Sequence, residues 1–232
     1  MATTCWPSVR GKVARFTKVT NCGAPSAGAK NTLTTDGFVT LDFAPEYEDG
    51  EEMSQKKADG RFAYLFKDDD QLKWVGVTIQ FTGVNPDLLG GIVLGQPIVL
   101  DHEGNAVGIR VGQVIGTDWA LETWTDIPGV ACTSAKPYGY FLAPWLHGGR
   151  LASWSVQNGA AEFKVENART QAGSLWGTGP YNVDLHAAVD PEDPPVPGKL
   201  LTPILADQHL DMHLTYVAPP TPACAASALV LA

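Results

Sequence analysis

Cysteine is scarce in this chain, and its spacing excludes two common uses. Cys5, Cys22, Cys132 and Cys224 are spread over 232 residues and form no Cys-x-x-Cys pair. A disulfide scaffold has more cysteines in a shorter chain, and a structural zinc site has closely spaced pairs of ligands. We therefore expect four free or buried thiols in a protein that is made in a reducing compartment.

Long apolar runs are also missing. No stretch reaches the roughly 18 apolar residues of a membrane-spanning helix, and the N-terminus has no apolar core typical of a signal peptide. The Ala-rich end after Cys224 is too short to span a bilayer and is typical of a frayed tail or a contact arm. These absences predict a soluble protein that is made inside the cell and does not bind a membrane.

Catalytic fingerprints are absent as well. The chain has no Gly-x-Ser-x-Gly elbow, no Walker A loop and no dinucleotide-binding glycine turn. Acidic clusters at 46–52 and 68–70 lack the glycine and the terminal glutamate of an EF-hand loop, so we interpret them as solvated loops. The sequence therefore predicts no enzyme and no cofactor.

Basic residues are outnumbered, since the net charge is −9, which argues against a dedicated nucleic-acid surface. Residues 1–35 carry five bases and no acid, whereas residues 36–70 carry eleven acids and four bases. Such blocks are usually solvated faces, but they also fit complementary surfaces of a self-associating protein. The candidate basic residues are Arg10, Lys12, Arg15, Lys18 and Lys30, and the candidate acids are Glu46, Glu48, Asp49, Glu51 and Glu52.

Glycine and proline are abundant and separate short alternating runs. The 24 glycines and 17 prolines favour many strands and turns over long helices. The clearest signal is a hairpin in which residues 151–157 and 160–166 alternate on either side of Asn158-Gly159. Both residues of this pair tolerate positive φ, so it suits a two-residue turn between antiparallel strands. The sequence therefore predicts a mainly β fold.

One helix is expected, at about residues 85–94. Asn85 is a good cap, Pro86 suits the first helical position, and Asp87 favours the positive end of the helix. Ala44-Pro45 is expected to end the second strand, because proline has no donor for a strand ladder. The expected strands are 10–20, 38–43, 51–57, 61–66 (a hairpin turning at Asp59-Gly60), 75–81, 98–100, 107–115, 119–124, 151–157, 160–166 and 208–217.

The chain divides by composition into three parts. Residues 1–184 are expected to form one β domain, which begins with a basic arm and first strand at 1–35. Residues 185–200 are rich in proline and predict a stiff linker. Residues 201–232 then supply a last strand and a tail, and the strand completes either its own sheet or that of a neighbouring copy.

A weak metal candidate lies in the last predicted strand. His209, Asp211 and His213 would share one face of a strand, and imidazole and carboxylate are zinc ligands. Alternate residues of a strand are roughly 6.5 Å apart, which is wide for ligands of one ion. The simpler interpretation is a polar outer face opposite a core face. The chain's seven tryptophans fit a sugar-stacking platform, but such residues more often fill a core or an interface.

Several stretches together resemble the major tail protein of long-tailed, non-contractile bacteriophages of actinobacterial hosts. The similarity covers most of residues 10–184, and residues 185–232 lie outside it. His147 departs from the pattern, which has a glutamine there. The stretches are 35–52 (TDGFVTLDFAPEYEDGEE), 85–108 (NPDLLGGIVLGQPIVLDHEGNAVG), 119–132 (WALETWTDIPGVAC), 138–149 (YGYFLAPWLHGG) and 174–181 (SLWGTGPY).

The resemblance implies a tail-tube subunit with a β-sandwich-like or barrel-like fold and a flanking helix. Such proteins form hexameric rings with a continuous inner β-barrel, and the rings stack head to tail around a lumen that conducts phage DNA without binding it specifically. The partners implied are further copies of the chain, the tape measure protein, the tail terminator and tail-tip proteins. The location implied is the virion tail, assembled in the host cytoplasm.

This resemblance gives the candidate residues provisional roles. The acidic segment is expected at the lumen or ring rim, because carboxylates repel DNA and let it slide. The basic residues are expected to contact the next ring. The alternatives are a tail terminator ring, a monomeric glycan-binding β-sandwich and, last, a zinc hydrolase that uses His209, Asp211 and His213.

Overall fold

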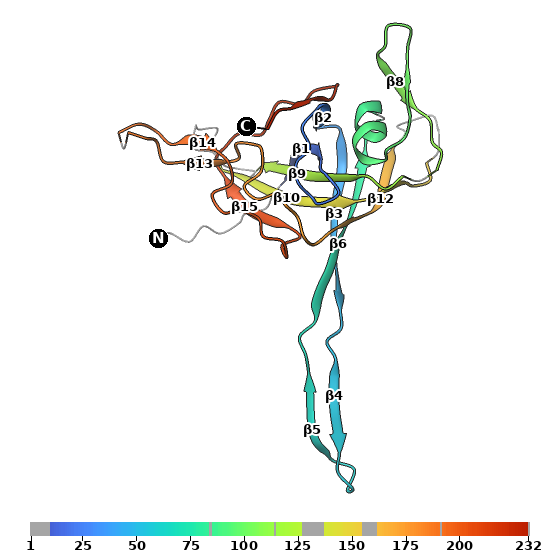
Figure 1. Cartoon of the computed structure of the whole chain (residues 1–232), viewed down its shortest axis with the longest axis vertical. Helices are drawn as coiled ribbons and strands as arrows, with labels where there is room; N and C mark the ends of the chain where they lie inside the picture. The colour runs from blue at the N-terminus through green and yellow to red at the C-terminus, as the bar shows by residue number, and fades with distance from the viewer. Residues whose placement is uncertain are drawn as a thin grey trace.

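The chain folds into a rounded body from which a long two-stranded arm projects (Figure 1). The computed structural model describes residues 10–83, 85–113, 115–126, 137–154, 162–190 and 192–231. The fold is mainly β with antiparallel sheets, as the alternating runs predict, and one short helix is present in the described residues. No helix in these ranges is long and apolar enough to cross a membrane.

The elements follow one another along the chain as strands interrupted by one helix. The strands are β1 (Arg10–Lys18), β2 (Gly28–Thr35), β3 (Phe38–Glu48), β4 (Glu52–Lys56), β5 (Phe62–Lys67), β6 (Gln71–Phe81), β7 (Ile98–Leu100), β8 (Ala106–Ile109), β9 (Asp118–Asp126), β10 (Tyr138–His147), β11 (Arg150–Leu151), β12 (Phe163–Thr170), β13 (Asp184–His186), β14 (Val196–Gly198), β15 (Asp211–Thr215) and β16 (Ser227–Leu229), and the helix η1 (Asp87–Val93) lies between β6 and β7.

One large sheet organises the body. Within the described ranges it holds ten strands, with the path β16-β2-β1-β9-β10-β12-β6-β3, and β11 and β15 attach to β12 and β10. The path ends at β16 and β3, so the sheet is open and forms no closed barrel in the described chain. β10 carries β15 along Tyr138–Leu142 and meets β12 at Leu146 and His147.

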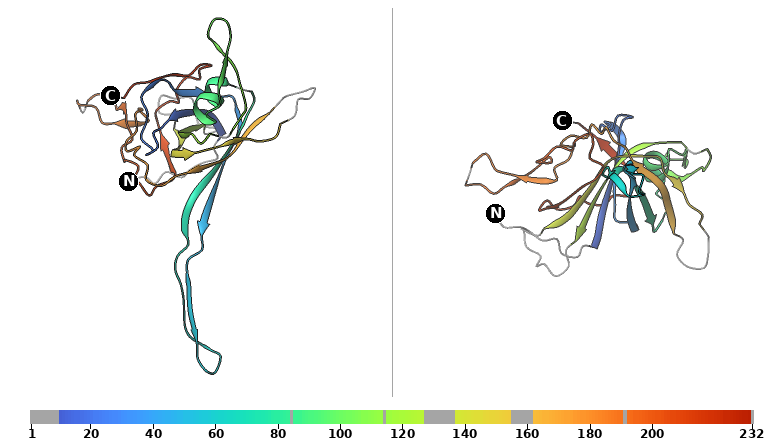
Figure 2. Two further views of the ribbon diagram at one scale, coloured as in Figure 1. Left: turned by 45° about the vertical axis from the view of Figure 1, so that its right-hand side comes forward. Right: turned by 90° about the horizontal axis from the view of Figure 1, so that it is seen from below.

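The larger core lies inside the curl of this sheet. The ring centres of Phe16 of β1 and Trp119 of β9 lie 5.7 Å apart, and those of Phe16 and Phe81 of β6 lie 6.0 Å apart. The helix closes this core with its apolar side chains. The helical residues buried here are Leu88, Leu89, Ile92 and Val93. The view from below in Figure 2 shows the sheet curling around this region.

A second core lies on the opposite face of β9 and β10. Trp124 and Tyr140 pack edge to face with their ring centres 5.1 Å apart. Trp176, Leu200 and other buried residues from the loops after β12 cover them. The C-terminal quarter of the chain therefore packs on the body and belongs to the same folded unit.

One sequence prediction about an element end is wrong. β3 continues through Pro45 to Glu48. It is an edge strand that pairs with β6 alone, and an edge strand tolerates proline, which has no N–H to donate, because one of its sides makes no ladder bonds. The helix expected at about 85–94 is confirmed as η1, which is wound as a π-helix, with the Leu94 amide donating to the Leu89 carbonyl at 2.8 Å. Asn85 still accepts a bond from the Leu88 amide, as the predicted cap does.

The proline-rich segment is not an extended linker. β13 and β14 pair within it as a small antiparallel hairpin, from Asp184 opposite Gly198 to His186 opposite Val196. The prolines suit this arrangement because a two-stranded hairpin leaves one side of each strand without ladder bonds. The strand predicted at 208–217 is β15, which pairs with β10 and so completes the sheet of its own chain.

The predicted hairpin at 151–166 is present in part. β11 pairs with β12, with Arg150 opposite Glu166 and Leu151 opposite Val165. A strict two-residue turn at Asn158-Gly159 would place Leu151 opposite Glu166, so the observed register differs by one residue. The turn itself lies outside the described residues.

Candidate functional site

The most distinctive feature of the molecule is the arm. β3 and β6 pair from Phe38 opposite Phe81 to Glu48 opposite Gln71, and they leave the body as one ribbon. β4 and β5 continue that ribbon to its end (Figure 1). The predicted hairpin around Asp59-Gly60 is therefore confirmed, and it forms the tip of a much longer structure.

The tip is a tight turn built from local hydrogen bonds. Gly60 has φ of 83° and its amide donates to the Lys57 carbonyl at 2.9 Å. The Arg61 amide donates to the Asp59 carboxylate at 3.0 Å. A Cβ on Gly60 would meet nothing within 4 Å, so the backbone conformation, rather than a lack of space, requires glycine there.

A short interruption of the ladder divides the arm near its middle. The Lys67 ammonium lies 3.0 Å from Asp70 and 3.9 Å from Asp49, and the Gly50 amide donates to Asp70 at 2.9 Å. The Gly50 hydrogen bond, followed by Lys67, lowers the pKa of Asp70. A Cβ on Gly50 would clash with the Asp68 carbonyl oxygen, so the two strands meet closely at this glycine.

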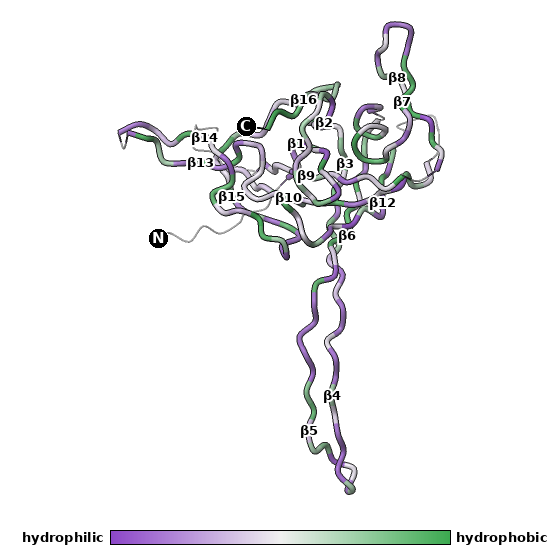
Figure 3. Tube along the Cα trace, viewed as in Figure 1, coloured by the Kyte–Doolittle hydropathy of each residue, from purple (hydrophilic) through white to green (hydrophobic). Residues whose placement is uncertain are grey.

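The distal arm carries apolar side chains that the body does not cover. Phe62, Tyr64 and Phe66 of β5 are 51%, 54% and 56% exposed. Met53 lies opposite Phe66, whereas a bulge in the ladder places Phe62 opposite Lys56. Figure 3 shows hydrophobic residues along this part of β5, far from the body. We call these four residues the aromatic face. An isolated two-stranded hairpin is at best marginally stable in water, so a ribbon with such a face is suited to a partner.

Sequence reasoning missed the aromatic face. It predicted the hairpin but considered only the acids of this region, whereas the available signal was the apolar run Phe62–Phe66. The sequence does not show that these residues find no core, because that depends on where the ribbon projects.

The predicted acidic residues all belong to the arm. The region expected to be a solvated loop is instead the end of β3, the interruption and the start of β4. Glu48 pairs with Lys73 across the ribbon. The described acids of this group are exposed, and they gather along the middle of the arm: Glu46, Glu48, Asp49, Glu51 and Glu52.

The predicted basic residues do not form an arm. They lie on β1 and β2, two strands within the main sheet, and they face different surroundings. Arg10 lies 3.8 Å from Asp126, Lys30 lies 3.1 Å from Asp87, and the Lys12 ammonium lies over the ring of Tyr138 at 5.4 Å. Lys18 ends β1 at a half-buried position. The five residues are therefore not one contact surface.

Arg15 is the clearest departure from expectation, because its side chain is buried in the body. Its Nε and Nη2 atoms each lie 2.6 Å from a carboxylate oxygen of Glu122, and Tyr140 donates to the same carboxylate at 2.7 Å. Its guanidinium also lies 3.3 Å from the ring centre of Tyr181. Arg15 thus binds within its own chain and cannot contact another ring.

Burial and charge shift the pKa values of this buried group. Burial alone lowers the pKa of Arg15, but the Glu122 carboxylate outweighs burial and the net pKa is raised. Burial, and then the charge of Glu122, raises the pKa of Tyr140 well above its usual value. Arg15 therefore stays charged and Tyr140 stays neutral. Together with Glu122 they form a fixed, hydrogen-bonded polar cluster inside the second core.

The metal candidate does not form a site. His209 precedes β15, and its Nδ1 lies 2.7 Å from the Thr170 hydroxyl. His213 instead lies between two carboxylates, with Nδ1 2.8 Å from Asp211 and Nε2 3.1 Å from Asp184. Across the described residues, no group of three histidine, cysteine, aspartate or glutamate side chains is placed to hold an ion.

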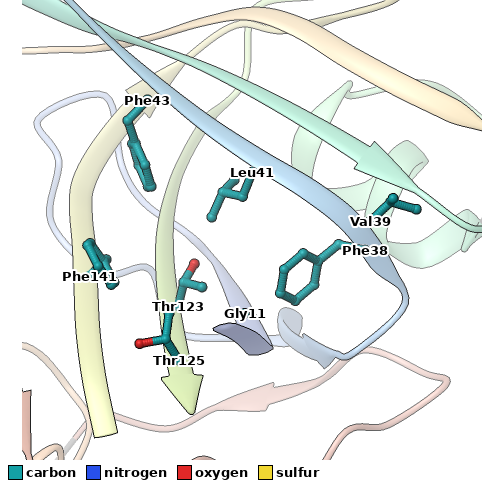
Figure 4. Close-up of a pocket in the computed structure, with 8 residues that line it drawn as sticks. All are labelled: Gly11, Phe38, Val39, Leu41, Phe43, Thr123, Thr125 and Phe141. Carbon is teal, nitrogen blue, oxygen red and sulfur yellow. The ribbon is translucent and has the colours of Figure 1, made fainter. Parts of the chain in front are cut away.

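The body also carries a shallow apolar hollow between β3 and the strands β1, β9 and β10 (Figure 4). Phe43 and Phe141 stack across it with ring centres 6.4 Å apart. No ionisable side chain lines it, so this hollow offers no acid or base. Its lining residues are Gly11, Phe38, Val39, Leu41, Phe43, Thr123, Thr125 and Phe141.

The tryptophans serve mainly as packing. Trp119, Trp124 and Trp176 are buried in the two cores, whereas Trp154 is exposed. A sugar-stacking platform needs several exposed rings on one surface, and the buried three are not available for that purpose.

Comparisons with known proteins add no family. A scan against models of protein families gave no match, and a search of curated protein sequences gave none.

Proposed function

We propose that this chain is a structural, non-enzymatic subunit of a phage tail tube. The observation that carries the proposal is the arm, a two-stranded ribbon that leaves the body with an uncovered aromatic face. A stack of identical rings supplies every arm with the same partner surface on the next copy. The five stretches that resemble major tail proteins support the same assignment.

The sheet of the body suits assembly into rings. β3 and β16 end the path of the sheet, and each leaves one edge of backbone donors and acceptors without a neighbouring strand in the described chain. Exposed edges pair readily with other strands. In the proposed tail-tube fold, edges of sandwich-like bodies join around a hexameric ring to form an inner barrel. Head-to-tail ring contacts are heterologous, so they extend as a tube.

In this role the chain belongs to the virion tail, after assembly in the host cytoplasm. Its partners are further copies of itself, the tape measure protein, the tail terminator and tail-tip proteins. DNA passes through the lumen without specific binding. The net charge of −9 supports passage rather than binding, because DNA carries one negative charge per about 1.7 Å of its axis.

Electron microscopy of the purified protein at rising concentration tests the proposal. We expect long hollow tubes of stacked rings for the natural chain. The triple variant Phe62→Ser/Tyr64→Ser/Phe66→Ser should give no tubes, because the aromatic face is removed. A matched control is Leu100→Ser/Val107→Ser/Val111→Ser, which removes three equally exposed apolar side chains from another projection and should leave tubes intact.

The other outcomes point to other functions. A monomer at every concentration would contradict the tail-tube proposal and would favour a glycan-binding sandwich, to be tested on glycan arrays. Isolated single rings of the natural chain would favour a terminator ring. Tubes formed equally well by the serine variant would show that the arm does not carry the assembly.

The acids of the arm have a separate expected role. Reversing Glu46, Glu48, Glu51 and Glu52 to lysine should leave tubes but impair DNA ejection, because a basic lumen or rim would bind the passing phosphates. Ejection from particles that contain the reversed subunit measures this effect. Normal ejection would exclude these residues from the DNA path.

A further inference from the structure

Two surfaces of opposite charge lie on opposite sides of the body. The β13–β14 hairpin projects from one side, and β11 and β12 lie on the other (Figures 1 and 2). The hairpin ends in an acidic turn, whereas the opposite side presents two arginines at a hollow. Neither feature belongs to the arm or to the two cores.

The acidic turn is exposed and held by its own hydrogen bonds. The Glu192 amide donates to the Asp190 carboxylate at 3.1 Å, and the Asp193 amide donates to the Asp190 carbonyl at 3.1 Å. Asp190, Glu192 and Asp193 have no cationic partner in the described part of the chain. Val189 and Val196 beside them are exposed, so the turn combines three carboxylates with apolar surface.

The opposite hollow is lined by the segment just before β9, by the end of β10 and the turn after it, and by β11 and β12. Arg150 is held by Glu166: its Nε and Nη2 atoms donate to the Glu166 carboxylate at 3.1 and 2.9 Å. Arg169 stacks over Trp74, with its guanidinium 4.7 Å from the ring centre. Both guanidiniums are exposed yet fixed in direction. The hollow is lined by Gly116, His147, Gly148, Gly149, Arg150, Asn167, Arg169 and Gln171.

We propose that the acidic turn of one copy docks in the Arg150–Arg169 hollow of the next copy and sets the lateral contact within a ring. The proposal rests on the tail-tube function and names the side-by-side partner, whereas the arm serves the contact between rings. A projecting turn fits a recess, and carboxylates pair with guanidiniums in bidentate geometry. Because the two surfaces differ, the contact is heterologous, and a rotation between copies closes it into a ring.

Complementary charge identifies the occupant. The chain itself supplies an exposed acidic turn, and its net charge of −9 makes it a poor partner for other polyanions. Complementary charges at an interface mainly set its register and association rate. The contact should therefore weaken with salt, since exposed charges are screened over about 10 Å at 0.1 M ionic strength.

Charge reversal with restoration tests the proposal. Arg150→Glu/Arg169→Glu and Asp190→Lys/Glu192→Lys/Asp193→Lys should each weaken ring formation about tenfold or more, measured by sedimentation velocity. Placing all five changes in one chain should restore rings, because the charges are exchanged. The control Arg10→Glu/Arg110→Glu makes the same change in net charge as the arginine reversal, on exposed residues elsewhere, and should leave rings intact. Circular dichroism checks that each variant is folded.

The outcomes separate this inference from the proposed function. A natural chain that stays monomeric would overturn both. Rings that form equally well after either reversal, or a five-fold variant that fails to restore them, would overturn the lateral contact alone. If the arginine reversal leaves rings intact but abolishes salt-sensitive retention of duplex DNA, the hollow binds phosphate and the lateral contact is wrong.

Discussion

The body and the arm use the same antiparallel pairing but differ in what covers their side chains. In the body, Phe16, Trp119 and Tyr140 are fully buried within the two cores. In the arm, Phe62, Tyr64 and Phe66 are about half exposed. The body is therefore stabilised by its own packing, whereas the arm presents apolar surface that nothing in the described chain covers. Substitutions in the two regions should affect different properties.

The largest effect on folding is expected in the body, at the buried ion pair. Arg15→Met leaves the Glu122 carboxylate buried without its cation and should lower the free energy of unfolding by about 3–5 kcal/mol. Urea denaturation of the monomer measures this loss. The double variant Arg15→Met/Glu122→Leu removes both charges and should recover much of the stability, because the uncompensated charge is gone.

The matching substitution in the arm is Lys67→Met, which removes an exposed pair with Asp70. Both charged groups of this pair are exposed to solvent, so its effect on the free energy of unfolding of the monomer should be small. A loss at Arg15→Met no larger than that at Lys67→Met would contradict the distinction between body and arm.

The sequence predicts the fold class and the arm's tip, but not the arm as a whole. Asp59-Gly60 identifies the hairpin because turn chemistry is local. Pro45 was wrongly predicted to end a strand, because its effect depends on whether the strand lies at a sheet edge. The segment 185–200 was wrongly predicted to be a linker, because the pairing of 184–198 depends on contacts that composition does not encode. Arg15 misled most: a basic residue is usually exposed, and its partner Glu122 lies 107 residues away.

A smaller effect on the free energy of unfolding is expected from two histidines at or near β15. Burial lowers the pKa of His213, but Asp211 and Asp184 outweigh burial, so the net pKa lies above 6.5. A raised pKa stabilises the fold below pH 6.5, and this contribution disappears as the pH rises through the folded-state pKa. His213→Gln should therefore lower the free energy of unfolding, relative to the natural chain, by more at pH 5.5 than at pH 8.5. Urea denaturation at the two pH values measures this difference.

His209 provides a control of opposite sign. Burial lowers its pKa, with Asp207 opposing, so protonation of His209 disfavours the folded state. The stabilising contribution of neutral His209 to the fold is present above pH 6.5 and is lost as the pH falls through the folded-state pKa. Relative to the natural chain, His209→Gln should therefore become less destabilising as the pH falls. The same pH trend for both variants would contradict the assignment of opposite shifts.

The smallest effect on folding is expected from the aromatic face itself. Phe62→Ser/Tyr64→Ser/Phe66→Ser removes side chains that contact no core, so the free energy of unfolding of the monomeric body should change by less than about 0.5 kcal/mol. Urea denaturation at a concentration below assembly measures it. A loss of several kcal/mol would mean that the arm packs on its own body in solution. An unchanged value together with lost tubes would show that the three rings serve contact between copies, because they then stabilise the assembly and not the subunit.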